Sequence, residues 1–223
     1  MIASTTEYVD TRDMIAVHTA FRREFRLAPG LVRGTAVGDV SRASIVSAHL
    51  ELFNGFLHLH HMGEDRLLWP KLLDRVPREL AAVITLMQTH HERIHDLMAS
   101  AETPLLRWRS RAGAAERDEL AGVLDQLYAV LEEHFGAEEQ HILPLAVRLM
   151  SAAEWQQLGK EGMAELPKNQ LSRVFGAIMY QGNPEVISSM LAHAPMLPRL
   201  LMPVLGPRAY ARYARRVHGT TKP

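Results

Sequence analysis

Cysteine is absent from the 223 residues of the sequence, and this absence excludes disulfides, thiolate metal ligands and thiol nucleophiles. No uninterrupted apolar run approaches the roughly 18 residues that a membrane-spanning helix needs, so no such helix is expected. The first residues are polar and acidic, without the hydrophobic segment of a secretory signal. We therefore expect a cytoplasmic protein.

A net charge of either sign is also lacking, because 25 Lys and Arg residues balance 25 Asp and Glu residues. This balance argues against nucleic acid as the main partner. Hydrophobic residues make up 47% of the chain, which is enough for a packed core and argues against wholesale disorder.

Charge and histidine are nevertheless unevenly distributed along the chain. Residues 1–150 contain 16 Lys and Arg against 21 Asp and Glu, with ten of the 12 histidines, whereas residues 195–223 contain six basic residues and no acidic one. Ser151-Ala-Ala-Glu has the pattern of a capping box that starts a new helix. We therefore predict a body over residues 1–150 and a helical extension over residues 151–223.

Apolar residues three and four positions apart predict helices throughout the chain, and no alternating strand pattern is convincing. Proline and glycine predict a stop at Ala28-Pro29-Gly30, a loop at 31–40, a kink or stop at Pro70 and an irregular stretch from Thr103-Pro104. The body helices are expected at residues 10–27, 41 or 44 to 74, 77–100 and 114–150. Modest connections between four helices predict an all-α fold: an antiparallel four-helix bundle with a C-terminal helical extension.

An internal repeat organises the histidines of the body. Both copies read His-x-x-x-Glu, followed by a second acidic residue and, six positions after the glutamate, by a proline. A further histidine precedes each copy by 42 or 43 residues. The body therefore consists of two matching halves. Their residues are His18, His60, Glu64, Asp65 and Pro70 in the first half, and His91, His134, Glu138, Glu139 and Pro144 in the second.

The spacing of the repeat predicts a metal site. Residues four apart share one helix face, so each repeated His-x-x-x-Glu presents an imidazole and a carboxylate together. With His18 and His91 from the other two helices, an inward orientation gives a cage of four histidines and two carboxylates. Buried charges are costly unless a cation compensates them. Nitrogen and oxygen ligands without sulfur suit iron, manganese or zinc, and two carboxylates that can bridge favour a dinuclear site.

The motifs resemble those of the hemerythrin-like (HHE cation-binding) family over about residues 10–150. The resemblance implies a four-helix bundle around a non-haem di-iron centre, with two iron ions joined by an oxo or hydroxo bridge and an open iron position that takes O2, peroxide or NO. It implies terminal ligands at His18, His60, His91 and His134, and bridging ligands at Glu64 and Glu138. The matching segments are His18, HLHHMGEDRLLWP (58–70), THHERIHDL (89–97) and HFGAEEQHILP (134–144).

Several ligand positions stay open at the level of sequence. Oxygen carriers of the family have two histidines four apart on the third helix, which here are either His91 with His95 or Met87 with His91. Their carboxylate on the fourth helix would be Glu139, whereas the internal repeat favours Glu138. His141, three residues after Glu138, also has a spacing used in carboxylate-bridged sites. Three flanking histidines are interpreted mainly as supporting or surface residues: His58, His61 and His90. Three others have no partner pattern and are interpreted as having no role: His49, His193 and His218.

The resemblance and the histidines lead to a functional hypothesis of binding or reacting with O2, H2O2 or NO. Extra histidines near the motifs favour oxygen or peroxide chemistry, including a catalase-like activity, over simple carriage. The alternative is a metal-binding sensor or iron-storage module without enzymatic activity.

The extension is predicted to form helices at residues 151–166, 167–181, 184–194 and 207–217, with an apolar stretch before the last one that Pro198 and Pro203 interrupt. We expect the end of the chain to dock on the bundle. The alternative is an amphipathic element that contacts a membrane surface or a partner. The residues expected to dock are Leu197, Leu200, Leu201, Leu205, Tyr210 and Tyr213.

Overall fold

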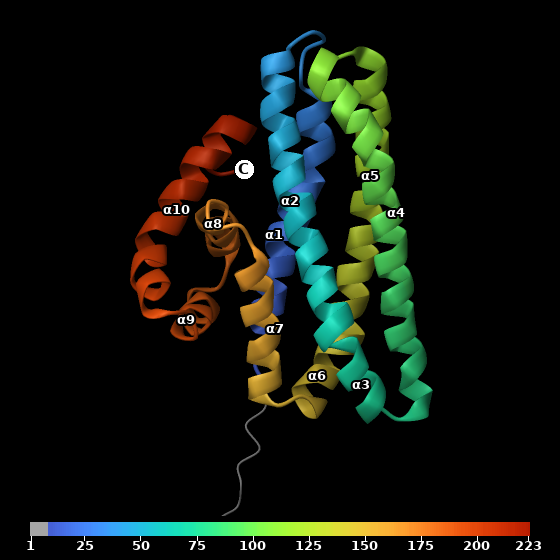
Figure 1. Ribbon diagram of the computed structural model, residues 1–223, viewed down its shortest axis with the longest axis vertical. Helices are drawn as coiled ribbons and strands as arrows, with labels where there is room; N and C mark the ends of the chain where they lie inside the picture. The colour runs from blue at the N-terminus through green and yellow to red at the C-terminus, as the bar shows by residue number, and fades with distance from the viewer. Residues whose placement is uncertain (1–8) are drawn as a thin grey trace, which may run out of the picture.

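The computed structural model describes residues 9–223, and the start of the chain, on which the prediction about a secretory signal depends, lies outside these residues. Every regular element of the described residues is helical, as predicted (Figure 1). Four long helices run side by side and alternate in direction, which confirms the antiparallel bundle. They are α1 (Arg12–Arg33), α2 (Val40–Leu67), α4 (Ala81–Arg111) and α5 (Ala114–Ala137).

Short elements close the lower end of the bundle in Figure 1. Pro70 lies in the first turn of the short helix that follows α2, which confirms the predicted interruption. The predicted fourth helix is continuous in direction but contains one π-helical turn. The short elements are α3 (Trp69–Arg75), η1 (Arg78–Leu80), η2 (Glu138–Ile142) and α6 (Leu143–Leu149).

Two predicted interruptions are wrong. α1 continues through Pro29 to Arg33, and α4 continues through Pro104 to Arg111. Proline removes one backbone hydrogen bond from a helix, but its fixed φ is compatible with helical backbone. Both prolines are buried in the bundle, so packing of the surrounding turns compensates for the lost bond.

The capping predictions have mixed outcomes. Ser151 caps α7 (Ala152–Glu165) as predicted, because its hydroxyl accepts from the Glu154 backbone N–H at 3.3 Å while the Ser151 N–H donates to the Glu154 carboxylate at 3.0 Å. The sequence offers Ser41 or Ser44 as the cap of the second helix, but Asp39 caps α2 instead and accepts from the backbone N–H of Arg42 at 2.9 Å, so the helix begins at Val40. A carboxylate also suits the positive end of the helix dipole.

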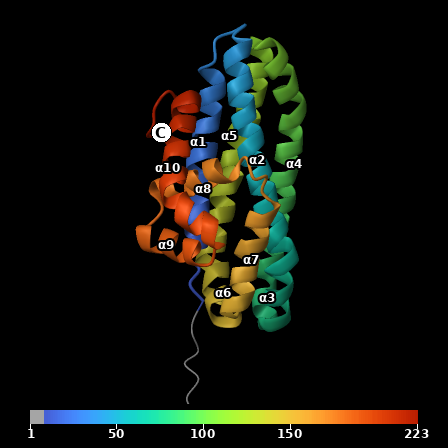
Figure 2. The ribbon, with the colours of Figure 1, turned by 60° about the vertical axis from the view of Figure 1, so that its left-hand side comes forward.

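The extension lies against α1 and α2 and consists of four helices (Figure 2). Its last helix was expected to begin only at Pro207, but it starts at Met196 and runs through Pro203 and Pro207. The elements are α7, α8 (Leu171–Gln181), α9 (Pro184–Ala192) and α10 (Met196–His218).

Only the second half of α10 docks. Tyr210, Ala214 and Val217 are at most 1% exposed, which confirms the docking predicted for Tyr210. The prediction is wrong for the first half, where Leu197 and Leu200 are 66% and 67% exposed and Leu201 and Leu205 are also exposed. The reason is geometric: α8 and α10 approach each other closely where Gly176 meets Gly206, because neither residue has a side chain there, and the buried residues of α10 lie from Gly206 onward.

The contact between Gly176 and Gly206 leads to a stability prediction. A Cβ atom on Gly176 would lie 2.3 Å from the Gly206 carbonyl oxygen and 2.8 Å from the Tyr210 Cβ. Relief of this clash would require the two helix backbones to move apart. We therefore expect Gly176→Ala to lower the free energy of unfolding by roughly 1–3 kcal/mol in a denaturant titration.

The matched control is Gly159→Ala at an exposed position of α7, where no atom lies within 4 Å of the new Cβ. This variant should gain about 0.5–1 kcal/mol from the better helix propensity of alanine. Equal stability of the two variants would contradict the close helix crossing.

Candidate metal centre

The structure brings the six predicted site residues to one level of the bundle. Buried apolar residues lie on both sides of this level. One core cluster includes Phe21 and Phe135, and the other includes Trp69. His18, Glu64, His134 and Glu138 are fully buried, His91 is 6% exposed and the side chain of His60 is 10% exposed. Four helices contribute: α1 carries His18, α2 carries His60 and Glu64, α4 carries His91, and α5 with η2 carries His134 and Glu138.

The Nε2 atoms of four imidazoles face the two carboxylates. The arrangement is pseudo-symmetric, because the upstream histidine of each half approaches the glutamate of the other half at the same distance. The Nε2 atoms of His18 and His60 also lie 3.3 Å apart, both directed to one region. The nitrogen–oxygen distances are 3.1 Å for His60–Glu64, 3.4 Å for His91–Glu64, 3.4 Å for His18–Glu138 and 3.7 Å for His134–Glu138.

The second acidic residue of each repeat holds the outer nitrogen of a histidine. His91 Nδ1 donates to Asp65 at 2.8 Å, and His18 Nδ1 donates to Glu139 at 2.9 Å. Arg22 donates to the same Glu139 oxygen at 2.6 Å. A proton held on Nδ1 leaves the Nε2 lone pair directed inward, which is the tautomer that a metal ligand requires.

Burial without hydrogen bonding characterises the inner atoms. Both oxygens of Glu64, both oxygens of Glu138, both nitrogens of His134 and the Nε2 of His91 have no hydrogen-bond partner. The imidazoles lie near the carboxylates but are not aligned as donors. Buried polar atoms left unpaired cost about 1–3 kcal/mol each, and more when charged. Carboxylate oxygens and imidazole nitrogens that are buried without hydrogen-bond partners fit metal cations, which would compensate their charge.

Protonation of the metal-free centre reflects crowding of like charges. Burial and the neighbouring Glu64 carboxylate raise the pKa of Glu138 well above its ordinary value. Burial opposes ionisation of Glu64 as well, but the adjacent His60 and His91 lower its pKa. Burial lowers the pKa of His60 to about 4. For His91, burial works against the cation, yet hydrogen bonding to Asp65 and the charge of Glu64 raise its pKa to about 9. Metal binding must therefore release protons.

His61 is the site residue that the sequence interpretation missed. It is 7% exposed, its ring stacks on His91 with centroids 4.0 Å apart and an interplanar angle of 13°, and its Nε2 has no hydrogen-bond partner. The signal in the sequence is the adjacent pair His60-His61. Neighbouring residues on a helix point about 100° apart, so two histidines of α2 can serve two positions.

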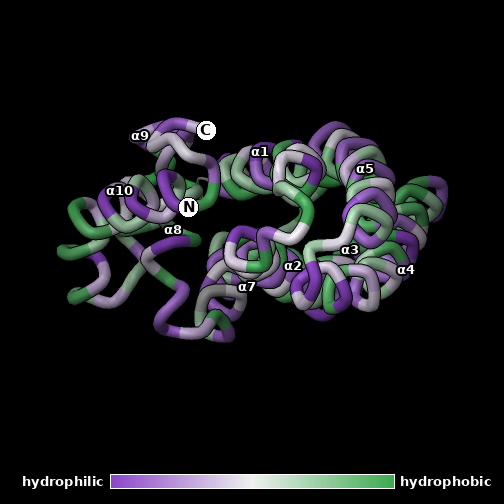
Figure 3. Tube along the Cα trace, turned by 90° about the horizontal axis from the view of Figure 1, so that it is seen from above, coloured by the Kyte–Doolittle hydropathy of each residue, from purple (hydrophilic) through white to green (hydrophobic). Residues whose placement is uncertain are grey.

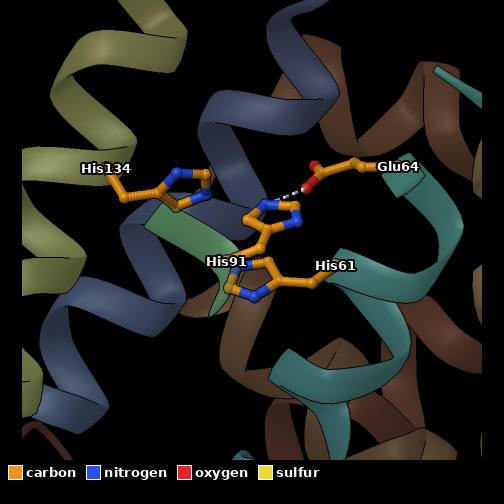
Figure 4. Close-up of side chains that lie close together, drawn as sticks. All are labelled: His61, Glu64, His91 and His134. Atoms are coloured by element: carbon orange, nitrogen blue, oxygen red, sulfur yellow. Dashed lines mark ion pairs between the residues drawn. The ribbon is translucent and has the colours of Figure 1, made fainter. Parts of the chain in front are cut away.

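Ligand-capable atoms form two groups that share Glu64. The atoms of His18, His60 and Glu64 lie within 4.8 Å of one another, and so do those of His61, Glu64, His91 and His134. Figure 4 shows the second group, with His61 and Glu64 on α2, His91 on α4 and His134 on α5. Met87, fully buried one turn before His91, provides no imidazole on α4, and His61 lies beside His91 instead.

The remaining alternatives lie outside these groups. His95 is exposed and lies beside exposed His58 at a centroid distance of 6.3 Å. His141 is exposed. His90 is 6% exposed and lies 6.0 Å from the His134 ring between centroids. Glu139 is directed at His18 Nδ1 and Arg22 rather than at the interior.

A local break in the helix positions Glu138. Pro144 has no N–H, so the carbonyl of Gln140 lacks its usual helical donor. The chain responds with the π-helical turn η2, in which the Glu138 carbonyl accepts from the N–H of Leu143. Such turns are frequent at functional sites. The repeated prolines therefore accompany different local structures: a π-helical turn at Glu138, and the junction between α2 and α3 after Glu64.

A third group, Glu24 with His49 and His218, differs because its carboxylate is satisfied. Tyr210 donates to Glu24 Oε1 at 2.5 Å, Arg23 donates to the same oxygen at 2.9 Å, and His218 Nε2 lies 3.1 Å from Oε2. Burial alone would raise the pKa of Glu24, but hydrogen bonding to His218 and the nearby charges lower it to about 2. The interpretation of His49 and His218 as residues without partners is wrong, because they join α10 to α1 and α2.

Buried imidazoles and carboxylates directed into an antiparallel four-helix bundle define a metal-binding helical protein. The chain matches the model of the hemerythrin HHE cation binding domain over residues 9–146, and it belongs to this family. Searches of curated proteins and of solved structures found no match to the chain.

Proposed function

We propose that the protein binds two iron ions in the bundle. The observation that carries this proposal is the pair of ligand groups that share Glu64 and whose inner atoms are buried without hydrogen bonds. The donor set of imidazoles and carboxylates without sulfur suits iron. His18 and His60 would hold one ion, His61, His91 and His134 the other, and Glu64 and Glu138 would bridge them.

The physiological role in this proposal is binding of O2, peroxide or NO, for which bound iron would supply the redox chemistry. Apolar side chains support binding: Phe135 stacks on His18 at 4.4 Å between centroids, Phe21 lies 5.3 Å from His60, and Trp69 lies 5.6 Å from His91. These rings exclude water and carry no acid for proton delivery. The sequence argument for peroxide turnover rested on extra histidines near the motifs, and two of them, His95 and His141, are exposed.

Metal analysis tests the ligand set. We expect the purified protein to contain about two iron ions per chain and His61→Ala to retain about one, because the second group would lose an imidazole. His95→Ala, which removes an exposed histidine four residues after His91, should retain both ions.

Optical spectra of the iron-loaded protein with O2 or NO, and an assay of peroxide decomposition, test the role. Spectral changes that reverse on removal of the gas, with little peroxide turnover, are expected. A folded protein that purifies without metal or with zinc alone would contradict the proposal, and full iron content in His61→Ala would exclude His61 as a ligand.

A further inference from the structure

The outward face of α10 changes character along its length. Its first half exposes six large apolar side chains, and Figure 3 shows this hydrophobic material at the outer edge of the molecule beside α10. Folded chains seldom leave so many neighbouring apolar side chains in water without a partner. The exposed fractions are 79% for Met196, 66% for Leu197, 67% for Leu200, 44% for Leu201, 51% for Val204 and 48% for Leu205.

The second half of the same face is basic. Arg208, Arg212, Arg215 and Arg216 are exposed, and at 100° per residue the first three share the side of the helix that carries Leu201 and the other apolar residues. No acidic residue follows Glu185 in the sequence. The face therefore consists of an apolar segment followed by an arginine segment.

We propose that this face of α10 binds the surface of a membrane that contains anionic lipids. The apolar segment would enter the boundary between headgroups and acyl chains, and the arginines would contact lipid phosphates. Among residues 9–223, no helix is long and apolar enough to span a bilayer, so the contact is peripheral. It depends on neither iron nor the bundle ligands.

The position of α10 supports this orientation. Its inner face stays attached through buried Tyr210 and Val217 and through the contacts with Glu24, so its outer face is free without unfolding. α10 lies on the side of the molecule away from α4 and α5 (Figure 1). The body, with 21 acidic against 16 basic residues over residues 1–150, would therefore point away from a negatively charged surface.

Charge also distinguishes the membrane from two other occupants. A two-fold contact between copies of the chain would place the same arginine segment against itself or close to itself, because both partners use the same patch. A nucleic acid would satisfy the arginines but would leave the apolar segment in water. An anionic bilayer matches both segments, because it offers an acyl region to the apolar residues and phosphates to the arginines.

Vesicle flotation with the full-length, iron-loaded protein tests the proposal. We expect binding to vesicles of phosphatidylcholine mixed with phosphatidylglycerol, much weaker binding to phosphatidylcholine alone, and a decrease with added salt. The triple variant Leu197→Gln, Leu200→Gln, Leu201→Gln should bind at least about tenfold more weakly. The triple variant Arg208→Gln, Arg212→Gln, Arg215→Gln should lose about 100-fold and most of the salt dependence.

The control variant is Leu106→Gln with Arg107→Gln on α4, an exposed apolar and basic pair on the bundle. It should bind vesicles as the unchanged protein does. All replaced side chains are exposed, so the melting temperature should not change. The proposal would be overturned if the unchanged protein did not bind vesicles, or if the leucine variant bound them equally well. It would also be overturned if the unchanged protein formed dimers without binding vesicles and the leucine variant were monomeric.

Discussion

Glu138→Gln is expected to have opposite effects on the loaded and the metal-free protein. In the loaded protein the change removes a bridging carboxylate, and iron content should fall from about two ions per chain to one or fewer. In the metal-free protein, Glu138 is fully buried beside Glu64 without a hydrogen-bond partner. A neutral amide of the same shape needs neither a bound proton nor a charge beside Glu64, so the free energy of unfolding at neutral pH should rise by about 1–4 kcal/mol.

The pH dependence of the metal-free protein provides a second readout. The folded pKa of Glu138 lies well above its ordinary value of 4.5 because of burial and the Glu64 charge. Between these two pKa values the folded state keeps a proton that the unfolded state has lost. The stability contribution of this group is therefore greatest below about pH 4.5 and decreases as pH rises through the folded pKa. Glu138→Gln should lack this decrease in denaturant titrations across pH.

Glu139→Gln is the control for the register of the fourth helix. Glu139 holds the Nδ1 of His18 and an Arg22 nitrogen, so its loss should weaken iron affinity about 10–100-fold while leaving two ions per chain at saturating iron. Loss of all iron in Glu139→Gln, with both ions kept in Glu138→Gln, would mean that the proposed ligand is wrong by one residue.

Removal of residues 195–223 is expected to lower stability strongly while preserving iron binding. The deletion removes buried Tyr210 and Val217, each worth about 1.5–3 kcal/mol. It also uncovers side chains of α8 that lie against α10, such as Met179 beside Gly206 and Tyr180 beside Tyr210. Glu24 keeps Arg23 but loses Tyr210 and His218. The melting temperature should fall by roughly 10–20 °C, with increased association.

Two comparisons make the deletion informative. All proposed ligands lie between His18 and Glu138, so iron content of the shortened chain should stay at about two ions per chain. The full-length leucine variant of α10 should keep the original melting temperature, because those side chains are exposed. An unchanged melting temperature after deletion, or loss of iron, would contradict the division into a ligand-bearing body and a docked extension.

The site could be predicted closely because its information is local and periodic. A spacing of four places His60 with Glu64, and His134 with Glu138, on single helix faces in any helical fold. The repeat then relates the two halves without knowledge of their packing. The same reasoning could not distinguish His61 from nearby histidines on the surface. Its place in the site depends on His91 of α4, and the centroids of the two rings lie 4.0 Å apart. The ligand roles themselves stay predictions.

The interrupted helices show the limit of local rules. Pro29, Pro104 and Pro203 lie inside helices that the sequence interpretation ended or broke, and Pro207 lies inside a helix that it expected to begin there. Pro70, by contrast, does interrupt α2 as predicted. A single proline costs a helix about one hydrogen bond and a steric adjustment, and the surrounding packing decides whether that cost is met. This packing cannot be predicted from the residues next to each proline in the sequence.

The helical class, the antiparallel bundle and the level at which imidazoles and carboxylates meet could all be predicted from the sequence. Helical periodicity is a property of each single helix, and the repeat relates the two halves of the body. Which nitrogen of His18 and of His91 faces inward depends on the tertiary structure, since Glu139 and Asp65 come from other helices. The tertiary structure also decided that α10 docks by its second half and leaves Leu197 and Leu200 exposed. The physical reason is that burial is a property of the facing surface, which a sequence pattern does not specify.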